Sequence, residues 1–594
     1  MHFIDWLILI VYFLGTAVVG LLYMRRGGKS MKDFFVSGRD LPWWLAGTSM
    51  VATSFSSDTP LFVTGLIRKE GIWRNWVWWS FAIGGMFAVF FMSRLWRRSE
   101  VITDVEFTEL RYSGKSAAIL RGFRGVYLAF YINCITMAWV ILAMLKFFEV
   151  AFGMGRWEAL VISCGITVAY SALSGLWGVV VTDMVQFVVA MIGSLTLAAI
   201  CVGVNGGFAP LRDAVVSATG GKDAVLRFLP ELPSVKTLFS KEFWTPAATS
   251  FFVFISIQWW ANKNSDGGSV VIQRMLACKT EKDSLLASLW FNIANYSLRT
   301  WPWVLVALAS IAAFPALKDL PVGVDDESVY VHMFMTLLPT GLLGLMVASF
   351  FAAFMSTVST HINLASAYFV NDIYKRFLVR EAEEKHYVLI ARVSSVAFMV
   401  ISGLMALKAK SISSIFEFLL AFSSGVGIVY ILRWFWWRVN AWTEVAAMVA
   451  SSVVSILLYV VPAKIVWMRT LSSQETLLAT VAVSFIVSLV VTFLTSPVAE
   501  EKLAEFYRRV RPPGFWGPVA AKVDLPPEAR PRYGRDLVNW IAGVALIFGS
   551  MFGLGKLCLG FWTSGVVYCI VGAVGAVVIW WNISRRQDLA PTTE

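Results

Sequence analysis

Small and oxygen-bearing side chains recur along one face of a predicted helix in the middle of the chain. The run 341–372 is otherwise apolar, and these residues stand three or four positions apart: Ser349, Ala353, Ser356, Thr357, Thr360 and Asn363. That spacing places them on one stripe of an α-helix. Hydroxyl and carbonyl oxygens are hard ligands, which suit a small hard cation. Close helix packing is the alternative role, because small residues let helix backbones approach each other.

A second polar stretch interrupts an apolar segment near the N-terminus. Residues 53–59 read TSFSSDT, and Pro60 follows them. A regular helix would turn these polar groups toward every side, lipid included, so we expect an unwound segment that lines a cavity. A polar kink buried between helices is the alternative. The candidate solute-binding residues are Thr53, Ser54, Ser56, Asp58 and Thr59, together with Gln258 from the apolar segment 243–262.

The composition of the chain places both stretches in a membrane. Of 594 residues, 58% are hydrophobic and 15% charged, and the mean hydropathy is +0.69. Many windows of about 20 residues are apolar enough to cross a bilayer, which predicts an all-α polytopic membrane protein in contact with lipid. The net charge of +12 reflects bases near helix ends and indicates no nucleic-acid partner. The six cysteines and four histidines show no disulfide framework and no metal-ligand spacing.

Basic residues beside the apolar segments predict an orientation. We count about fifteen segments, near 3–24, 43–66, 73–95, 123–152, 157–176, 180–203, 243–262, 285–314, 341–371, 386–408, 411–437, 442–462, 476–496, 536–556 and 560–582. Odd-numbered segments are followed by Lys and Arg clusters that include Arg25, Arg26, Lys29, Arg97, Arg98, Lys115, Arg508, Arg509, Arg530, Arg532, Arg585 and Arg586. The positive-inside rule then predicts a multi-pass protein of the plasma (inner) membrane, with its N-terminus outside and its C-terminus in the cytoplasm.

Two apolar segments with polar interruptions open two groups of five segments each. Segment 43–66 contains the TSFSSDT stretch, and segment 243–262 runs into a polar, glycine-containing stretch that ends at VIQR. If the count of segments holds, the two groups face opposite ways across the bilayer. Two such groups, each led by a broken helix, are the arrangement of an inverted repeat, and broken helices at mid-membrane depth point to a transporter's binding site.

Four motifs carry a resemblance to a known family. They are WW…GTSMVAT from residue 43, YSALSGLWGVVVTDMVQF at 170–187, VIQRMLACKTEKDS at 271–284 and AAFMSTVSTHINLASAYFVNDIY at 352–374. Over roughly residues 1–440 the chain resembles the sodium:solute symporter family. The resemblance implies a five-plus-five inverted repeat of the leucine-transporter-like kind. We expect an extra helix and cytoplasmic loop at 1–42, repeats at 43–203 and 243–440, an external loop at 204–242 and peripheral helices at 441–594.

The same resemblance implies where sodium binds. The positions that match the family's main sodium site are Ala52, Phe55, Ala353, Ser356 and Thr357. Some members of the family have a second sodium site, and the matching positions here are Asp183, Ser356, Ser359 and Thr360. An ionisable residue inside a membrane is costly, so Asp183 is a functional candidate. A helix-capping role for Asp183 is the alternative.

These observations predict sodium-coupled symport of a small polar organic solute by alternating access, with a sugar or related solute favoured. The alternatives are a solute-gated channel and a membrane receptor that does not transport. Nothing indicates an enzyme, and the chain has no nucleotide-binding GxxxxGK[ST] loop. The sequence leaves the solute open. Asn133, Thr136 and Glu417 are further polar residues that could reach a central cavity. Arg299 is expected in an interior salt bridge, and contact with an anionic substrate is the alternative.

Overall fold

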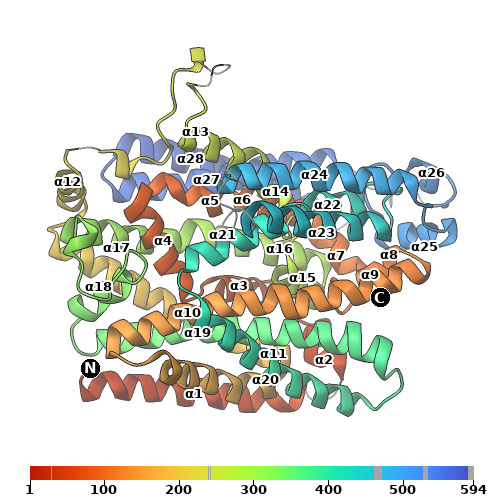
Figure 1. Ribbon diagram of the computed structural model, residues 1–594, viewed down its shortest axis with the longest axis horizontal. Coiled ribbons are helices and arrows are strands. Elements are labelled where there is room, and N and C mark those ends of the chain that lie inside the picture. The colour runs from red at the N-terminus through yellow and green to blue at the C-terminus, as the bar shows by residue number, and fades with distance from the viewer. Residues whose placement is uncertain are drawn as a thin grey trace.

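The computed structural model describes residues 1–27, 30–221, 223–237, 240, 242–460, 471–525 and 533–585. Within these ranges the chain folds into helices joined by loops, and β-pairing is limited to two isolated bridges. The long helices lie side by side along the longest axis of the molecule (Figure 1). The prediction of an all-α fold is confirmed. Of the bases used for the orientation prediction, Lys29, Arg530, Arg532 and Arg586 lie outside the described residues.

The helices fall into three successive groups along the chain. The first comprises α1 (Phe3–Gly27), α2 (Met31–Val36), α3 (Trp43–Ser54), α4 (Asp58–Glu70), α5 (Trp76–Trp79), α6 (Phe81–Phe87), α7 (Ser93–Ser99), α8 (Phe107–Arg111), α9 (Gly114–Val126), α10 (Asn133–Phe152), α11 (Arg156–Val204) and α12 (Phe208–Ala218). The second comprises α13 (Pro246–Val253), α14 (Trp259–Ala261), α15 (Ser269–Ala277), α16 (Glu281–Asn292), α17 (Thr300–Ala313), α18 (Val329–Leu337), α19 (Leu342–Ala367), α20 (Glu384–Lys408), α21 (Ile412–Ser423) and α22 (Gly427–Phe435). The third comprises α23 (Ala441–Ser455), α24 (Ser473–Leu494), α25 (Glu500–Val510), α26 (Gly517–Ala520), α27 (Gly534–Cys558) and α28 (Trp562–Ser584).

The membrane-crossing helices differ from the expected segments in detail. By length and composition, nine helices among the described residues are able to cross a membrane, or ten if α21 and α22, bent by 43°, form one span. The expected segments 43–66 and 285–314 are interrupted, the latter at Arg299 after the π-helical turn η8 (Ile293–Leu298). The expected segments 157–176 and 180–203 form the single helical segment α11. The boundaries of the two repeats stay a prediction.

The break after α3 is shorter than the sequence predicts. Helix α3 ends at Ser54, and α4 begins at Asp58, so only residues 55–57 are non-helical. Phe55 leaves the helical region with φ −85° and ψ 76°. Pro60 lies in the first turn of α4, where a missing N–H costs nothing. Thr53, Ser54, Asp58 and Thr59 are therefore helical residues at the two edges of the break.

A second break separates α14 from α15. It spans residues 262–268, and it ends in Gly267 and Gly268, whose φ angles are +128° and +78°. Residues with a side chain rarely adopt positive φ angles, so glycine is needed at both positions. The segment 262–268 matches the interruption expected after segment 243–262, and each predicted repeat therefore starts with a broken helix.

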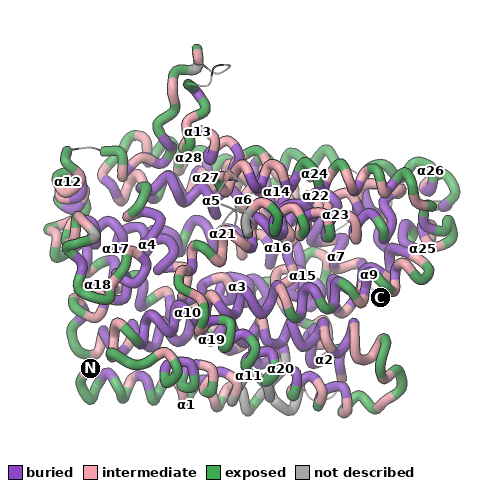
Figure 2. Tube along the Cα trace, viewed as in Figure 1, coloured by how far each residue is buried: buried purple, intermediate pink, exposed green. Residues whose placement is uncertain are grey.

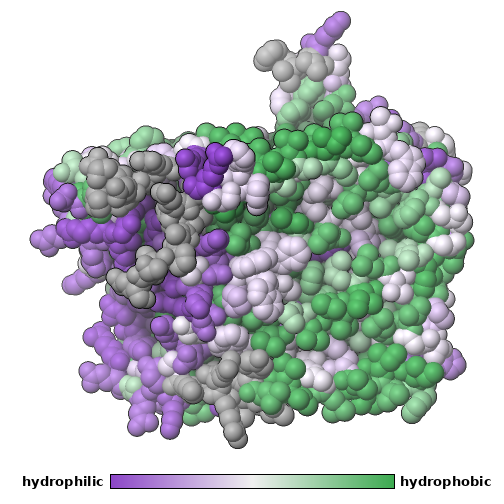
Figure 3. Space-filling model, turned by 180° about the vertical axis from the view of Figure 1, so that it is seen from behind, coloured by the Kyte–Doolittle hydropathy of each residue, from purple (hydrophilic) through white to green (hydrophobic). Residues whose placement is uncertain are grey.

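Helix α19 lies at the centre of the molecule. It contacts α1, α3, α10, α11 and α20, and nearly every side chain between Leu343 and Ala367 is buried. Figure 2 shows buried residues concentrated along α3, α10 and α19, with exposed residues on the outer helices. Apolar residues cover much of the surface seen in Figure 3, while hydrophilic residues gather at the end of the molecule where α9 and α25 lie. The stripe predicted from the sequence is thus held in the protein interior.

Candidate functional site

The end of α3 meets the middle of α19. The Thr357 hydroxyl donates a hydrogen bond to the Thr53 carbonyl oxygen at 2.7 Å, and to the Ala353 carbonyl oxygen at 3.1 Å. The residues predicted for the main sodium site, Ala52, Phe55, Ala353, Ser356 and Thr357, are all buried. The two elements that must supply the ligands are therefore in direct contact, and the residue next to Ala52 forms the link. Which atoms bind sodium stays a prediction.

Asp183 lies in the interior of α11 and its side chain is fully buried, which excludes the capping role. Its carboxylate accepts a hydrogen bond from the Ser49 hydroxyl at 2.5 Å and another from the Ser356 hydroxyl at 2.6 Å. Ser356 is thus hydrogen-bonded to the acidic residue of the predicted second sodium site while it also belongs to the predicted main site.

A buried guanidinium lies among the oxygens of the predicted second site. Arg274, from α15, has its Nη2 atom 3.6 Å from the Asp183 Oδ2 atom, and it donates to the Thr360 hydroxyl at 2.6 Å. Its Nε atom donates to the Ser49 hydroxyl at 3.2 Å. Ser359 instead donates to the Ser356 carbonyl oxygen at 3.1 Å. Arg274 belongs to the VIQR motif, but no pattern in the sequence places its charge beside Asp183.

A cavity of about 350 Å³ lies between the two broken helices. The residues 53–59 that were predicted to bind solute, Thr53, Ser54, Ser56, Asp58 and Thr59, all line it, as do Asn133 and Thr136 of α10. Gln258 does not line this cavity. Its side-chain amide donates to the Val77 carbonyl oxygen at 2.5 Å and to the Ser80 hydroxyl at 3.3 Å, so it holds α5 rather than facing the cavity.

Several polar atoms in the cavity wall have no partner in the protein. The Asp58 Oδ1, Asn292 Oδ1, Asn295 Oδ1 and Arg299 Nη1 atoms are buried without a hydrogen bond to any described residue. Leaving a buried polar group unpaired costs about 1–3 kcal/mol, so such groups call for a role. Gly85 of α6 leaves room for the Asn292 side chain, because a Cβ atom at residue 85 would lie only 2.0 Å from the Asn292 Oδ1 atom. These atoms make the cavity a candidate site for a polar ligand.

Two expectations about charged residues are corrected by the structure. Arg299 forms no ion pair with any described residue; its Nε atom donates to the Asn295 carbonyl oxygen at 3.0 Å, and its guanidinium lies 5.2 Å from the centre of the Trp303 ring. Glu417 lies outside the cavity lining and accepts a hydrogen bond from Ser473 at 3.2 Å. Asp58, which also lines the cavity, is not within ion-pair distance of Arg299.

Sequence reasoning missed several residues of the cavity. Lys263 and Asn264 come from the break between α14 and α15, Asn295 from η8, and His361 from α19. The His361 Nδ1 atom lies 2.6 Å from the Asn133 Oδ1 atom. The signal for Lys263 was present in the sequence, because the polar stretch NKNSDGG follows an apolar run just as TSFSSDT does.

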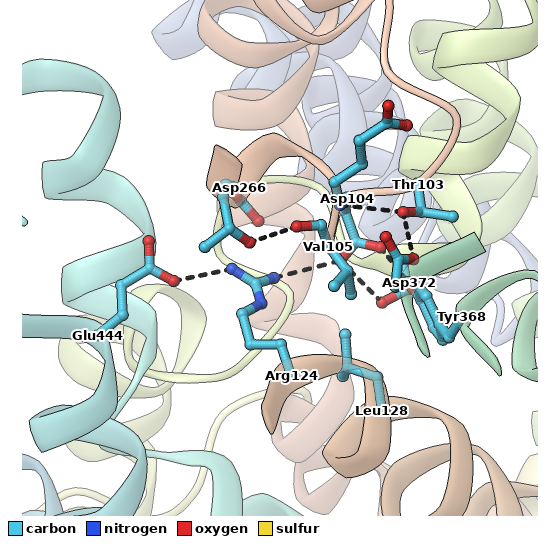
Figure 4. A network of polar contacts seen from close by, with 12 residues as sticks. Thr103, Asp104, Val105, Arg124, Leu128, Asp266, Tyr368, Asp372 and Glu444 are labelled. Atoms are coloured by element: carbon cyan, nitrogen blue, oxygen red, sulfur yellow. Dashed lines mark hydrogen bonds and ion pairs between the residues drawn. The ribbon is translucent and has the colours of Figure 1, made fainter. Parts of the chain in front are cut away.

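Beside the cavity lies a network of paired buried charges, which we call the Arg124 network. Arg124 of α9 lies between Glu444 of α23, at 2.8 Å, and Asp104, at 3.5 Å (Figure 4). Asp104 also accepts a hydrogen bond from the Tyr368 hydroxyl at 2.5 Å. Asp266, in the second break, pairs with Arg433 of α22 at 2.6 Å. The network therefore ties the non-helical segment 262–268 to helices from three other parts of the chain.

Comparisons with known proteins agree with this architecture. Residues 34–453 match the model of the sodium:solute symporter family. The chain is 25% identical over 477 residues to a sodium/glucose cotransporter of Vibrio parahaemolyticus. The aligned region covers 76% of this chain and 84% of that protein. It is 25% identical over 470 residues to the human sodium/myo-inositol cotransporter 2, covering 73% and 66% of the two chains.

Among solved structures, the fold resembles that of a Na⁺-coupled sialic acid symporter in a substrate-bound outward-open state. The TM-score is 0.65 at 19% identity, and the match covers 84% of this chain and 99% of that one. This similarity shows the fold, an all-α polytopic membrane architecture, and the family match spans most of the chain. The chain belongs to the sodium:solute symporter family.

Proposed function

We propose that the protein is a secondary active transporter that couples sodium movement to symport of a small polyhydroxylated solute, a sugar or a related compound. Family membership supports sodium as the coupling ion, and two relatives are named for glucose and myo-inositol, which are hydroxylated rings. One observation carries the proposal. Thr53 and Thr357, joined by a 2.7 Å hydrogen bond at the predicted sodium site, both line the cavity.

The main sodium ion would bind at Ala52, Phe55, Ala353, Ser356 and Thr357. The helical hydrogen-bond pattern ends at the break after α3, so carbonyl oxygens become available there, and the α19 hydroxyls would supply the remaining ligands. A bound ion would fix the edge of the break, and Thr53, Ser54, Ser56, Asp58 and Thr59 would then be held in place for the solute. Because such coupling is reciprocal, the solute should tighten sodium binding by the same factor.

A second sodium ion at Asp183, Ser356, Ser359 and Thr360 is also part of the proposal. This ion would share the Asp183 carboxylate with the Arg274 guanidinium, which lies 3.6 Å from it. Sodium at that position must therefore compete with a charge that is fixed in the protein. The second ion would bind more weakly than the first, since its ligand Thr360 accepts a hydrogen bond from Arg274 at 2.6 Å, whereas Arg274 reaches the Thr53 hydroxyl only at 3.5 Å.

We propose the orientation that the basic residues predict, with the N-terminus outside and the C-terminus in the cytoplasm. Lys115, Arg508 and Arg509 are exposed, and α9 and α25, which hold them, lie at the same end of the molecule (Figure 1). One-sided clustering of bases supports a cytoplasmic end. A reporter that is active only outside the cytoplasm, fused to the C-terminus, should stay silent. Activity of that fusion would refute the orientation.

The function itself is tested by ligand-induced stabilisation of the purified protein. D-glucose, myo-inositol and D-glucuronate would each be added in sodium chloride and in potassium chloride. A solute that binds the folded state raises the melting temperature, and a coupled solute should do so more strongly in sodium. Uptake into proteoliposomes driven by an inward sodium gradient should follow the same solute preference. Uptake that is equal with and without the gradient would contradict symport and favour a channel.

A further inference from the structure

The charged side chains in the cavity wall are unbalanced toward positive charge. Lys263 and Arg299 supply two cations, and Asp58 supplies one carboxylate among the described residues that line the cavity. None of the three forms an ion pair with a described residue, and the Lys263 ammonium group also has no hydrogen bond there. Arg299 is buried, whereas Lys263 and Asp58 are half-buried. Charges taken out of water are normally paired, because desolvation is expensive. The cavity therefore has one positive charge in excess before sodium arrives.

Among the described residues, no nearby acid is free to neutralise Lys263. The carboxylate whose charge acts on it is that of Asp104. That carboxylate already accepts hydrogen bonds from Tyr368 at 2.5 Å and Ser269 at 3.4 Å, and it pairs with Arg124 at 3.5 Å. Asp266, three residues after Lys263, is paired with Arg433 at 2.6 Å. Asp104 and Asp266 are thus already paired within the Arg124 network, and Lys263 faces the cavity without a carboxylate partner among the described residues.

Arg299 gives the second cation a fixed position. Its side chain is only 4% exposed, one guanidinium edge is anchored to the Asn295 carbonyl oxygen, and the Nη1 atom is unpaired. Asp58, which also lines the cavity, is the acid whose charge acts on this guanidinium, so Lys263 is the cation that no carboxylate of the cavity wall offsets among the described residues. Groups of another kind also line the cavity: the amides of Asn264, Asn292 and Asn295 and the rings of Trp78 and Trp139. Amides bind hydroxyl groups, and aromatic faces cover the apolar face of a ring.

We propose that the solute is an anionic, polyhydroxylated monocarboxylate, that is, a sugar acid rather than a neutral sugar. This inference rests on the proposed function and narrows its substrate class. The carboxylate is held by Lys263, the hydroxyl groups by Arg299 and the asparagines, and Asp58 accepts a hydrogen bond from a hydroxyl. The volume of about 350 Å³ fits one monosaccharide-sized molecule. A solute charge of −1 cancels the excess positive charge of the wall.

The test uses ligands that differ only in charge. D-glucuronate and D-gluconate would be compared with D-glucuronamide and D-glucose, in sodium, by thermal shift and by sodium-driven uptake into proteoliposomes. We expect both acids to bind at least about tenfold more tightly than the neutral pair, since a hydrogen bond to a charged group is worth about 1.5–3 kcal/mol. Equal or tighter binding of glucose or glucuronamide would overturn the proposal. So would failure of both acids to bind, or preferential binding of the zwitterion L-serine.

The variant Lys263→Gln tests the residue. It should weaken glucuronate binding by about tenfold to a hundredfold and leave glucuronamide unchanged. Lys115→Gln, at an exposed lysine, should leave glucuronate binding unchanged. An equal loss for acid and amide would show that Lys263 acts only structurally and would refute its role. The net charge moved per glucuronate should also be one less than the sodium moved per glucuronate, measured from current and ²²Na⁺ flux; equal values would contradict an anionic solute.

The two proposals fail in different ways. Sodium-driven uptake of glucose without uptake of either acid would overturn the sugar-acid proposal and leave sodium-coupled symport intact. Uptake of glucuronate that does not depend on the sodium gradient would overturn the proposed function while the preference for the acid stood. A single panel of four solutes, measured in sodium and in potassium, therefore separates the two.

Discussion

Charged side chains fill the Arg124 network and also line the central cavity, and the two regions differ in how those charges are satisfied. In the network, Arg124, Arg433, Glu444 and Asp266 are all at most 1% exposed, and each has a partner of opposite charge. In the cavity, Lys263 and Arg299 have none among the described residues. The segment 262–268 joins the two regions, because it contributes Asp266 to one and Lys263 to the other.

The difference separates structural charges from functional ones. In a buried ion pair whose members satisfy each other, no charge is left for a ligand. Removing one member leaves the other charge unpaired, at a cost of about 3–5 kcal/mol. An unpaired charge beside a cavity destabilises the protein until a ligand arrives. Burial alone does not distinguish Arg299 from the network residues, but the state of its partners does.

The largest effect is expected in the network. Glu444→Gln keeps the shape of the side chain but removes the charge that Arg124 Nη1 meets at 2.8 Å and Arg433 Nη1 at 3.4 Å. We expect the free energy of unfolding to fall by about 3–5 kcal/mol. The melting temperature in detergent would measure this loss. Lys263→Gln is the control and should leave the melting temperature without ligand nearly unchanged or slightly raised. If both variants lost equal stability, the distinction between the regions would not hold.

Next in size is the effect of the double variant Ser356→Ala and Thr357→Ala on sodium coupling. Both changes keep the residues small, so packing should suffer little, while two oxygen ligands are lost. Coupling between ligands is typically about 5–150-fold in affinity, and we expect it to vanish here. Solute binding measured in sodium and in potassium would become equal.

Ser349 offers a matched control on the same stripe. Its hydroxyl donates to the Val189 and Leu345 carbonyl oxygens, each at 2.8 Å, so its role is helix packing. Ser349→Ala should preserve sodium dependence. If the stripe served packing alone, the double variant would lower the melting temperature and keep its sodium dependence. That result would remove the main sodium site from the proposal.

Sequence reasoning found those parts of the site that follow from local pattern. The stripe of α19 follows from helical spacing, and the break after α3 follows from TSFSSDT, although Asp58 and Thr59 turn out to be helical. What escaped it were relations between distant segments. Gln258 is polar within an apolar run, as a binding residue would be, yet Val77 satisfies it. The positions of Arg274 beside Asp183, and of Lys263 away from any free acid, depend on helix packing that no local pattern specifies.

The pair Asp183 and Arg274 is intermediate between the two regions, because its charges are 3.6 Å apart and both side chains are fully buried. Asp183→Asn alone should lower the melting temperature, because Arg274 loses its counter-charge. Adding Arg274→Gln should recover part of that loss, with a coupling energy of about 0.5–3 kcal/mol. If a second sodium ion uses the carboxylate, the Hill slope for sodium should fall in both variants. An unchanged slope in both would leave Asp183 with a structural role only.

The smallest effect is expected where paired charges lie near water. Glu327, in the loop before α18, pairs with Lys146 at 2.7 Å and accepts hydrogen bonds from Ser413. Burial opposes the charged form, yet Lys146 and Ser413 together hold the pKa of Glu327 below its ordinary value of 4.5. A carboxyl group whose pKa is lower in the folded state stabilises the fold above its unfolded pKa, and this stabilisation is lost as the pH falls through the folded value.

The wild-type melting temperature should therefore decline below about pH 4.5, and Glu327→Gln should remove part of that decline while lowering the melting temperature at pH 7. Glu231→Gln, at an exposed loop carboxylate, should leave the pH profile unchanged. Lys146 also pairs with Asp325, whose side chain is 55% exposed, so water competes for the Lys146 charge. Glu327→Gln should therefore lower the stability less than Glu444→Gln does. An equal loss at pH 7 would mean that the depth of a charge pair in this protein does not determine its contribution to stability.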